Sequence, residues 1–309
     1  MFDLRYHAAS LAAVFLALAV GVLLGVAISG KVSNTQESAQ KAIIEQLNRD
    51  LAAERERTKA AGRRGEAAER VVEDAYPSLM AGRLEGRRFA LLFLGGVDGG
   101  LRSAVERTLA DGDSGAPVRM TALALPLDPK GLHDLLAPQT TLAAYAADSD
   151  WSDLGRDLGR ELVLGGATPL WAAVSGQLVG ERSGTSFPPV DGVIVVRSWN
   201  ASPSGDVEAA TRRQASERFI VGVLDGLQAT GVPVVGIENA GVQAAASSID
   251  LYRERGVSSV DDADTVAGRL ALALLLAGGE PGHYGVKDSA SDGVVPPIES
   301  VPAATTVGG

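Results

Sequence analysis

The longest uninterrupted apolar segment lies near the N-terminus, over residues 8–29 (AASLAAVFLALAVGVLLGVAIS), and contains no charged residue. As a helix it would be about 33 Å long, which is enough to cross the hydrocarbon core of a bilayer. The apolar part of a cleavable signal peptide is shorter, roughly 7–15 residues. We therefore expect an uncleaved transmembrane helix in contact with membrane lipid. The small residues Ala27 and Ser29 leave cleavage open as an alternative.

Two glycines in this segment, Gly21 and Gly25, have the G-x-x-x-G spacing that lets two membrane helices approach closely. They are candidates for packing the anchor against a second copy. The flanking basic residues, Arg5 before the segment and Lys31 after it, do not define an orientation by the positive-inside rule. The orientation that we expect, with residues 1–7 in the cytoplasm and the C-terminal domain outside, rests mostly on a resemblance given below.

A mostly polar segment, rich in Ala, Glu, Arg and Gln, follows over residues 33–76 and contains no proline. These residue types favour helix. Ile44, Leu47 and Leu51 recur at the spacing of a coiled-coil seam, but the seam is poor further along, where Gly65 is one of two glycines that suggest a flexible joint. Two interpretations follow: a solvated helical spacer, or a coiled-coil-like stalk that forms a homodimer.

Between residues 86 and 287, continuous apolar runs alternate with segments of helical spacing. Continuous runs are typical of parallel strands that are buried on both faces. The strands are predicted at residues 88–95, 118–125, 192–197 and 232–237, and the helices at residues 101–109, 151–164, 167–179, 206–230 and 261–277. This order predicts a doubly wound, three-layer α/β domain. Residues 288–309, rich in Ser, Pro, Gly and Val, are expected to form a disordered tail.

Composition and charge exclude several classes of function. The 309 residues include 38 acidic and 28 basic side chains, and the net charge of −10 argues against binding nucleic acid through its phosphates. The chain has no cysteine, which removes thiolate nucleophiles, disulfides, zinc fingers and iron–sulfur sites. It contains no G-x-S-x-G or H-E-x-x-H motif and no carboxylate pair of recognisable spacing. We therefore expect neither enzyme activity nor a resident cofactor.

Two features near predicted strand ends could carry chemistry. The turn at residues 95–100 (GGVDGG) could hold phosphate on its backbone N–H groups, but it lacks the G-x-G-x-x-G spacing and a Walker lysine. A tight turn is the simpler interpretation. Asp261, Asp262 and Asp264 could ligate Mg²⁺ or Ca²⁺. Acidic residues that open a helix also suit its dipole, so a structural role explains them as well.

A third feature, the motif Gly282-His283-Tyr284-Gly285, follows the last predicted helix. One interpretation is a turn that packs against the domain, and the other is a binding or docking loop. We take these four residues as a candidate interaction loop.

Several segments together carry a resemblance to a known family. They are the opening MFDLRYHAASLAAVFLALAVGVLLGVAISG, the charged helix after it, the segments FLGGVDGG and DGVIVV, and the ending SVDDADTVAGRLALALLLAG with GHYGVK. Over about residues 1–287 the chain resembles the actinobacterial copper transport protein family MctB. The resemblance implies an envelope protein tied to copper efflux and homeostasis, in some descriptions an outer-membrane channel. Close relatives are also linked to cell-wall integrity and cell separation through a partner.

The side chains available in the sequence do not suit direct binding of copper. Cu(I) prefers thiolate and thioether ligands, whereas the chain has no cysteine and only three methionines, Met1, Met80 and Met120. The copper link therefore comes from the resemblance alone, and the metal ligands stay unknown. The expected function is copper homeostasis or efflux through an unidentified envelope protein partner. The alternative is a dimeric coiled-coil scaffold or regulator of cell-wall integrity and cell separation in the envelope.

Overall fold

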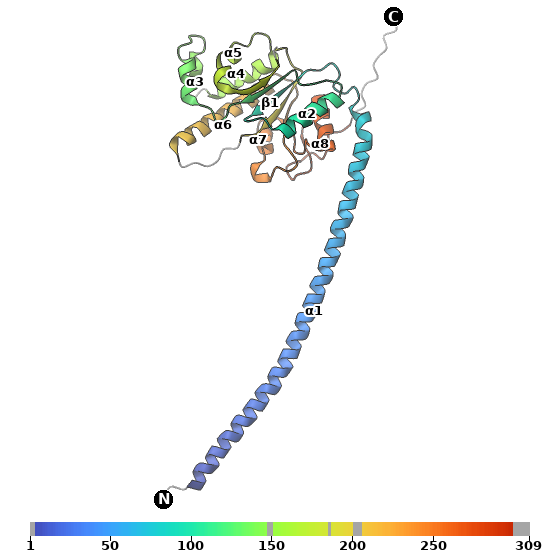
Figure 1. Ribbon diagram of the computed structural model, residues 1–309, viewed down its shortest axis with the longest axis vertical. Coiled ribbons are helices and arrows are strands. Elements are labelled where there is room, and N and C mark those ends of the chain that lie inside the picture. Colours follow the sequence, from blue (N-terminus) through green and yellow to red (C-terminus); the bar gives the residue numbers. More distant parts are fainter. Residues whose placement is uncertain (1–3, 147–150, 185–186, 200–205, 299–309) are drawn as a thin grey trace. The chain divides into compact units, whose positions relative to one another are not determined.

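The computed structural model describes residues 4–146, 151–184, 187–199 and 206–298 (Figure 1). The chain divides into two compact units, Met1–Ala68 and Glu69–Gly309. Helix α1 (Leu4–Met80) forms the described part of the first unit and continues into the second. The second unit contains the whole sheet and the remaining helices.

Helix α1 joins segments that the sequence divides into an anchor and a stalk. It runs without interruption through Gly62 and Gly65, where a joint was expected. A glycine inside a helix costs about 1 kcal/mol relative to alanine. Strong helix formers surround both positions, so this cost does not end the helix.

The expected transmembrane helix over residues 8–29 is wrong. Within the part of the chain that the structure describes, no helix has an apolar stretch long enough to span a membrane. The apolar run does not form a helix of its own but is the start of α1, which continues directly into charged sequence.

The described residues form one mixed seven-stranded sheet in the order β3-β2-β1-β4-β5-β6-β7. Its strands are β1 (Phe89–Leu94), β2 (Arg119–Leu123), β3 (Val179–Ser183), β4 (Gly192–Arg197), β5 (Val234–Ile237), β6 (Ser258–Val260) and β7 (His283–Tyr284). Neighbouring strands are parallel, except that β3 runs antiparallel to β2. The α/β class predicted from the alternating pattern is therefore correct, with an antiparallel edge that the pattern did not indicate.

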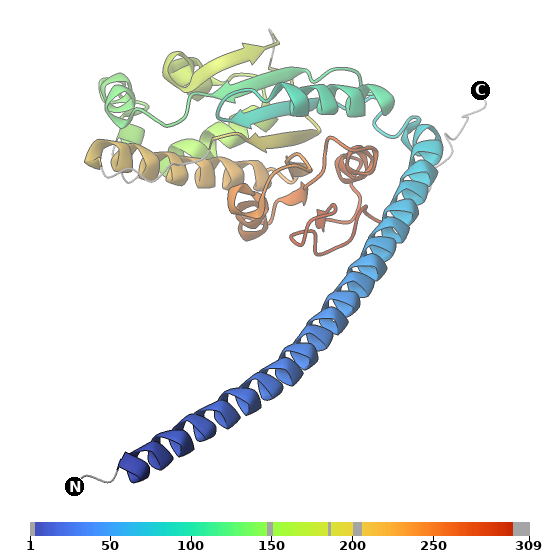
Figure 2. The same ribbon diagram turned by 60° about the horizontal axis from the view of Figure 1, so that its bottom comes forward.

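Helices cover both faces of this sheet and make it a three-layer domain. Besides α1, they are α2 (Gly99–Asp111), α3 (Pro129–Leu136), α4 (Trp151–Leu164), α5 (Pro169–Leu178), α6 (Val207–Gln228), α7 (Ile249–Glu254) and α8 (Val266–Leu276), with short 3₁₀ turns η1 (Ala143–Ala146) and η3 (Ala244–Ala246). Helices α2 and α8 contact each other on one face (Figure 2). Helices α4 and α6 pack together in the layer on the other face.

Alternate residues of the central strands face the two layers. In β1 all six residues are buried: Leu92 belongs to the core under α3–α6, and Phe93 to the core under α2, α8 and the C-terminal end of α1. A strand buried on both faces has no polar positions, which explains its continuous apolar sequence. Met80, the last residue of helix α1, is fully buried in the second core.

Residues 288–298, the first part of the expected tail, belong to the described part of the chain. Val295 packs against the core under α2 and α8. The Asp292 side chain accepts a hydrogen bond from the backbone N–H of His283, with a distance of 2.8 Å between Oδ2 and N. Residues 299–309 lie outside the described residues, as do residues 1–3 of the segment expected in the cytoplasm.

Candidate functional site

In open α/β sheets, ligands bind beyond the carboxyl ends of the parallel strands, where the strand order reverses. Here that point lies between β1 and β4, because β2 continues the sheet on one side of this pair and β5 on the other. The polar residues that follow β1, β5, β6 and β7 therefore define the candidate site.

The crevice between β1 and β4 is closed by the backbone itself. The amides of Ser198 and Trp199 both donate to the carbonyl oxygen of Leu94, at 3.2 and 2.9 Å. Gly95 has a φ of +123°, and a β-carbon there would lie 2.7 Å from the Trp199 nitrogen. The two loops thus touch at a position that only glycine can occupy.

The glycine-rich turn at residues 95–100 ends in a capped helix. Oδ1 of Asp98 accepts a hydrogen bond from the amide of Leu101, at 2.9 Å, as the N-cap of α2. A phosphate in this turn would have to compete with that carboxylate for the helix N-terminus. The arrangement favours the interpretation of a tight turn.

A buried ion pair lies at the ends of β5 and β7. Nζ of Lys287 donates to Oε1 of Glu238 at 2.7 Å and to the carbonyl oxygen of Asn239 at 2.8 Å. The two charged side chains are only 16 % and 8 % exposed. Glu238 also accepts from the Ser247 hydroxyl and the Ser248 amide, each at 3.0 Å, so it is fully engaged.

Sequence reasoning missed this pair. A usable signal was present, because Glu238 and Asn239 directly follow the apolar run VPVVGI and so had to lie at the carboxyl end of a buried strand. Nothing in the sequence indicated that Lys287, which is 49 residues away, would meet them.

Asp261 organises the loop that follows β7. It is 1 % exposed, and its carboxylate accepts hydrogen bonds from the amides of Val286 at 2.9 Å and Lys287 at 3.2 Å. A β-carbon at Gly285 would collide with this carboxylate, and Gly285 has a φ of +142°. The last glycine of the GHYG motif is therefore required by the carboxylate that it faces.

Asp262 and Asp264 have separate partners. Asp264 accepts a hydrogen bond from the amide of Ala240 at 2.7 Å. Asp262 is fully buried; its Oδ2 accepts from the Thr265 hydroxyl at 2.9 Å, and its Oδ1 has no partner. Burial raises the pKa of Asp262 to about 6. Helix α8 starts after these residues, at Val266, because Thr265 caps it by accepting from the Gly268 amide at 3.0 Å.

The described part of the chain has no group of three or more His, Asp or Glu side chains that could hold a metal ion. The carboxylates of Asp261 and Asp264 bind backbone amides of different loops, and that of Asp262 binds Thr265. The three carboxylates thus bond to separate groups around the end of β6, and their interpretation as residues that suit the dipole of a helix stays a prediction.

The GHYG motif forms the edge strand β7 and its two flanking glycines. Nδ1 of His283 lies 2.9 Å from the Ser259 hydroxyl, and burial lowers the pKa of the imidazole. The Tyr284 hydroxyl donates to the Glu280 carbonyl at 3.1 Å, and the Gly282 amide donates to the Ser258 hydroxyl at 3.2 Å. The motif thus pairs with β6, and a docking role for it stays a prediction.

The two glycines of the apolar segment lie on helix α1, in the first unit. No other atom lies within 4 Å of the position that a β-carbon would take at Gly21 or Gly25. A role for this pair in helix packing also stays a prediction.

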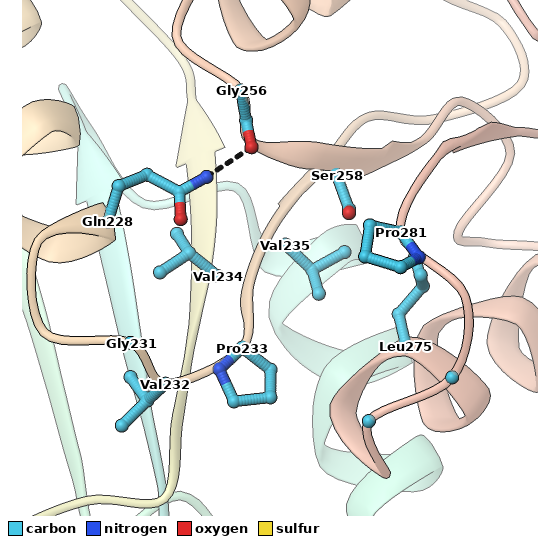
Figure 3. A pocket seen from close by; sticks show the side chains of 12 residues that line it. Gln228, Gly231, Val232, Pro233, Val234, Val235, Gly256, Ser258, Leu275 and Pro281 are labelled. Carbon is cyan, nitrogen blue, oxygen red and sulfur yellow. Dashed lines mark hydrogen bonds between the residues drawn. The ribbon is translucent and has the colours of Figure 1, made fainter.

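A pocket of about 280 Å³ lies at the opposite edge of the sheet, at the amino ends of β5 and β6 (Figure 3). The apolar side chains that line it in this view are Val232, Pro233, Val234, Val235, Leu275 and Pro281. Its side-chain amide, from Gln228, already donates to the Gly256 carbonyl (Figure 3). No titratable side chain of the described residues lines it, so it offers no acid–base or metal chemistry.

Comparison with known proteins identifies the family. No curated protein matches the chain. The family model described as "Copper transport outer membrane protein, MctB" matches residues 1–296, which is nearly the whole chain. That name refers to copper transport and to an outer-membrane location. The chain therefore belongs to the MctB family of copper transport proteins.

Proposed function

We propose that this protein acts in copper homeostasis or efflux through a protein partner that supplies the copper ligands. Membership of a copper transport family supports the link to copper. The proposal assigns the protein a supporting role, in which its α/β domain binds another component of the export machinery. Copper is the cargo of that machinery in this account, and the chain itself does not hold it.

The observation that carries this proposal is that the acidic side chains at the carboxyl edge and the two thioethers of the described residues are bonded or buried. The acidic side chains at the carboxyl edge bind backbone amides, Thr265 or Lys287. Met80 and Met120, which carry the thioethers that Cu(I) would prefer, are 0 % and 3 % exposed and pack in the core under α2 and α8. The sequence contains no cysteine.

The test measures cell-associated copper under mild copper stress in a deletion strain, the parent strain and a complemented strain. We expect a several-fold rise on deletion that complementation reverses. Unchanged copper would contradict a role in copper homeostasis. In parallel, the purified chain is titrated with Cu(I) against a competing chelator. Tight binding at one ion per chain would contradict the partner-dependent role.

A dimeric scaffold or regulator of cell-wall integrity and cell separation is a second candidate, favoured by helix α1. Ile44, Leu47 and Leu51 of this helix are 56 %, 65 % and 46 % exposed, and their spacing of three and four residues forms one stripe. Such a stripe is buried when two helices associate as a coiled coil. A dimeric mass in sedimentation, together with a cell-separation defect and unchanged copper in the deletion strain, would favour this candidate over the first.

A further inference from the structure

A second pocket, of about 170 Å³, lies beside the antiparallel edge of the sheet. Helix α5 provides one wall, strands β2 and β3 provide the floor, and the segment that begins at Phe187 closes one side. It is separate from the polar residues at the carboxyl edge and from the pocket in Figure 3, with which it shares no lining residue.

Four polar side chains that line this pocket have nothing to bind. They are the hydroxyls of Thr121, Thr168 and Ser175 and the guanidinium of Arg182. Within the described part of the chain, none of the four makes a hydrogen bond or ion pair, and Thr168 leaves its N-cap hydroxyl unused. Thr121 is 5 % exposed as a residue. The lining thus carries hydrogen-bond donors that have no acceptor among the described residues.

The guanidinium of Arg119 adds a second positive charge next to Phe187, one of the residues that line the pocket. Arg119 is 2 % exposed, and its Nε and Nη1 have no hydrogen-bond partner. Among the described residues it has no carboxylate partner either, and Nη2 donates to the carbonyls of Leu162 and Pro188. Its guanidinium lies 4.5 Å from the centroid of Phe187, the ring that also lines the pocket. Burial lowers its pKa to about 10, so Arg119 stays charged at neutral pH.

An acidic residue near helix α5, Glu161, bonds to the start of that helix. The carboxylate of Glu161 accepts hydrogen bonds from the amides of Leu170 and Trp171, at 3.1 and 3.0 Å, and so occupies the N-terminus of α5. It does not line the pocket, and no other carboxylate of the described residues does. The lining is therefore cationic and rich in donors.

Two aromatic rings supply the apolar surface. Trp171 is 5 % exposed, and its indole N–H donates to the Leu158 carbonyl at 2.9 Å, which fixes the ring. The Arg119 guanidinium lies over the ring of Phe187. Rigid aromatic walls with a few polar groups are typical of pockets for small organic ligands.

We propose that this pocket binds a small organic carboxylate. An ionised carboxylate only accepts hydrogen bonds, so it complements the guanidinium of Arg182 and the neighbouring hydroxyls, and a planar guanidinium can hold both of its oxygens. The apolar body of the ligand packs against Trp171 and Phe187. Arg119 contributes through its field, since its own donors are enclosed.

The experiment titrates the full chain with benzoate by calorimetry, with benzamide as the uncharged control. We expect saturable binding of one benzoate per chain and at least tenfold weaker binding of benzamide. The variant Arg182→Gln should weaken benzoate binding at least tenfold. The variant Ala172→Trp, at an exposed lining position, should fill the pocket and abolish binding. Arg64→Gln, the same change of charge on exposed α1, should bind as the parent does.

Three results would each overturn the proposal. They are the absence of saturable benzoate binding, equal affinity for benzamide, and unchanged affinity in the Arg182→Gln variant. Circular dichroism of each variant verifies that it is folded. If Ala172→Trp does not fold, the benzoate affinities of Arg182→Gln and Arg64→Gln still test the proposal, because neither change alters the packing of the core.

Discussion

Lys287 and Glu238 form an ion pair with 2.7 Å between Nζ and Oε1, and both side chains are largely buried. The pair ties the loop after β7 to the end of β5, across the intervening strand β6. The same lysine contributes its backbone amide to the Asp261 carboxylate. One residue therefore joins three strand ends at the carboxyl edge.

Replacing Lys287 by methionine should destabilise the domain by about 3–5 kcal/mol, because it leaves the Glu238 carboxylate buried without its counter-ion. Urea unfolding of the purified chain measures this loss. The double variant Lys287→Met with Glu238→Gln should recover part of it. Lys130→Met is the matched control, since that lysine is 89 % exposed in its pair with Asp134, and its effect should stay below about 1 kcal/mol. Equal effects at Lys287 and Lys130 would contradict the structural role of the buried pair.

Gly285→Ala should destabilise the domain by roughly 2–4 kcal/mol, since the new β-carbon would meet the Asp261 carboxylate at a φ that side chains rarely adopt. Gly293→Ala separates the effect of the positive φ from that of the contact with the carboxylate. Gly293 also has a positive φ, of +107°, but it has open space around it. We expect Gly293→Ala to cost about 1–2 kcal/mol, measured by thermal unfolding. If Gly285→Ala is as stable as Gly293→Ala, the Asp261 carboxylate does not require glycine at position 285.

The buried carboxyl of Asp262 should make stability depend on pH. Its pKa is about 6 in the folded chain, against 3.8 as the ordinary value, so the folded state binds the proton more tightly than the unfolded state. The penalty for ionising it is absent below pH 3.8 and complete above about pH 6. It amounts to at most about 3 kcal/mol.

The variant Asp262→Asn isolates this effect, because the other titrating groups are common to both proteins. The free energy of unfolding of the parent, relative to the variant, should fall as the pH rises from 4 to 7. Denaturant unfolding at several pH values measures the difference. A constant difference over that range would mean that Asp262 is already ionised at pH 4.

The seam of α1 predicts association between two copies of the chain. Leu47→Asp places a charge in the stripe of Ile44, Leu47 and Leu51, and should weaken the dimer at least tenfold in sedimentation equilibrium. Gln46→Asp introduces the same charge at an exposed position on the other side of the helix, off the stripe, and should leave the mass unchanged. A monomeric parent chain, or equal weakening by both variants, would contradict a dimer through α1.

Only part of the candidate site could be predicted from the sequence, as Asp261 and Gly285 show. The sequence suggested Asp261 as a possible metal ligand and Gly285 as part of a candidate interaction loop. Their actual relation, a carboxylate facing a glycine 24 positions later, depends on β7 lying beside β6. A strand of two residues such as His283–Tyr284 has too little pattern to be predicted. Arg119 likewise lay within a predicted strand, and its lack of a counter-ion became visible only in the packed domain.

The sequence by itself determined the α/β class and the central strands, because strands such as Phe89–Leu94 and Gly192–Arg197 are buried on both faces and so must be apolar throughout. It also carried the family resemblance. Only the tertiary structure decided that the N-terminal apolar run is the start of one long helix, that Lys287 meets Glu238, and that Arg182 and three hydroxyls share a pocket. Local patterns report how each residue is buried, whereas the pairing of distant charges and donors depends on strand order and register, which no local pattern encodes.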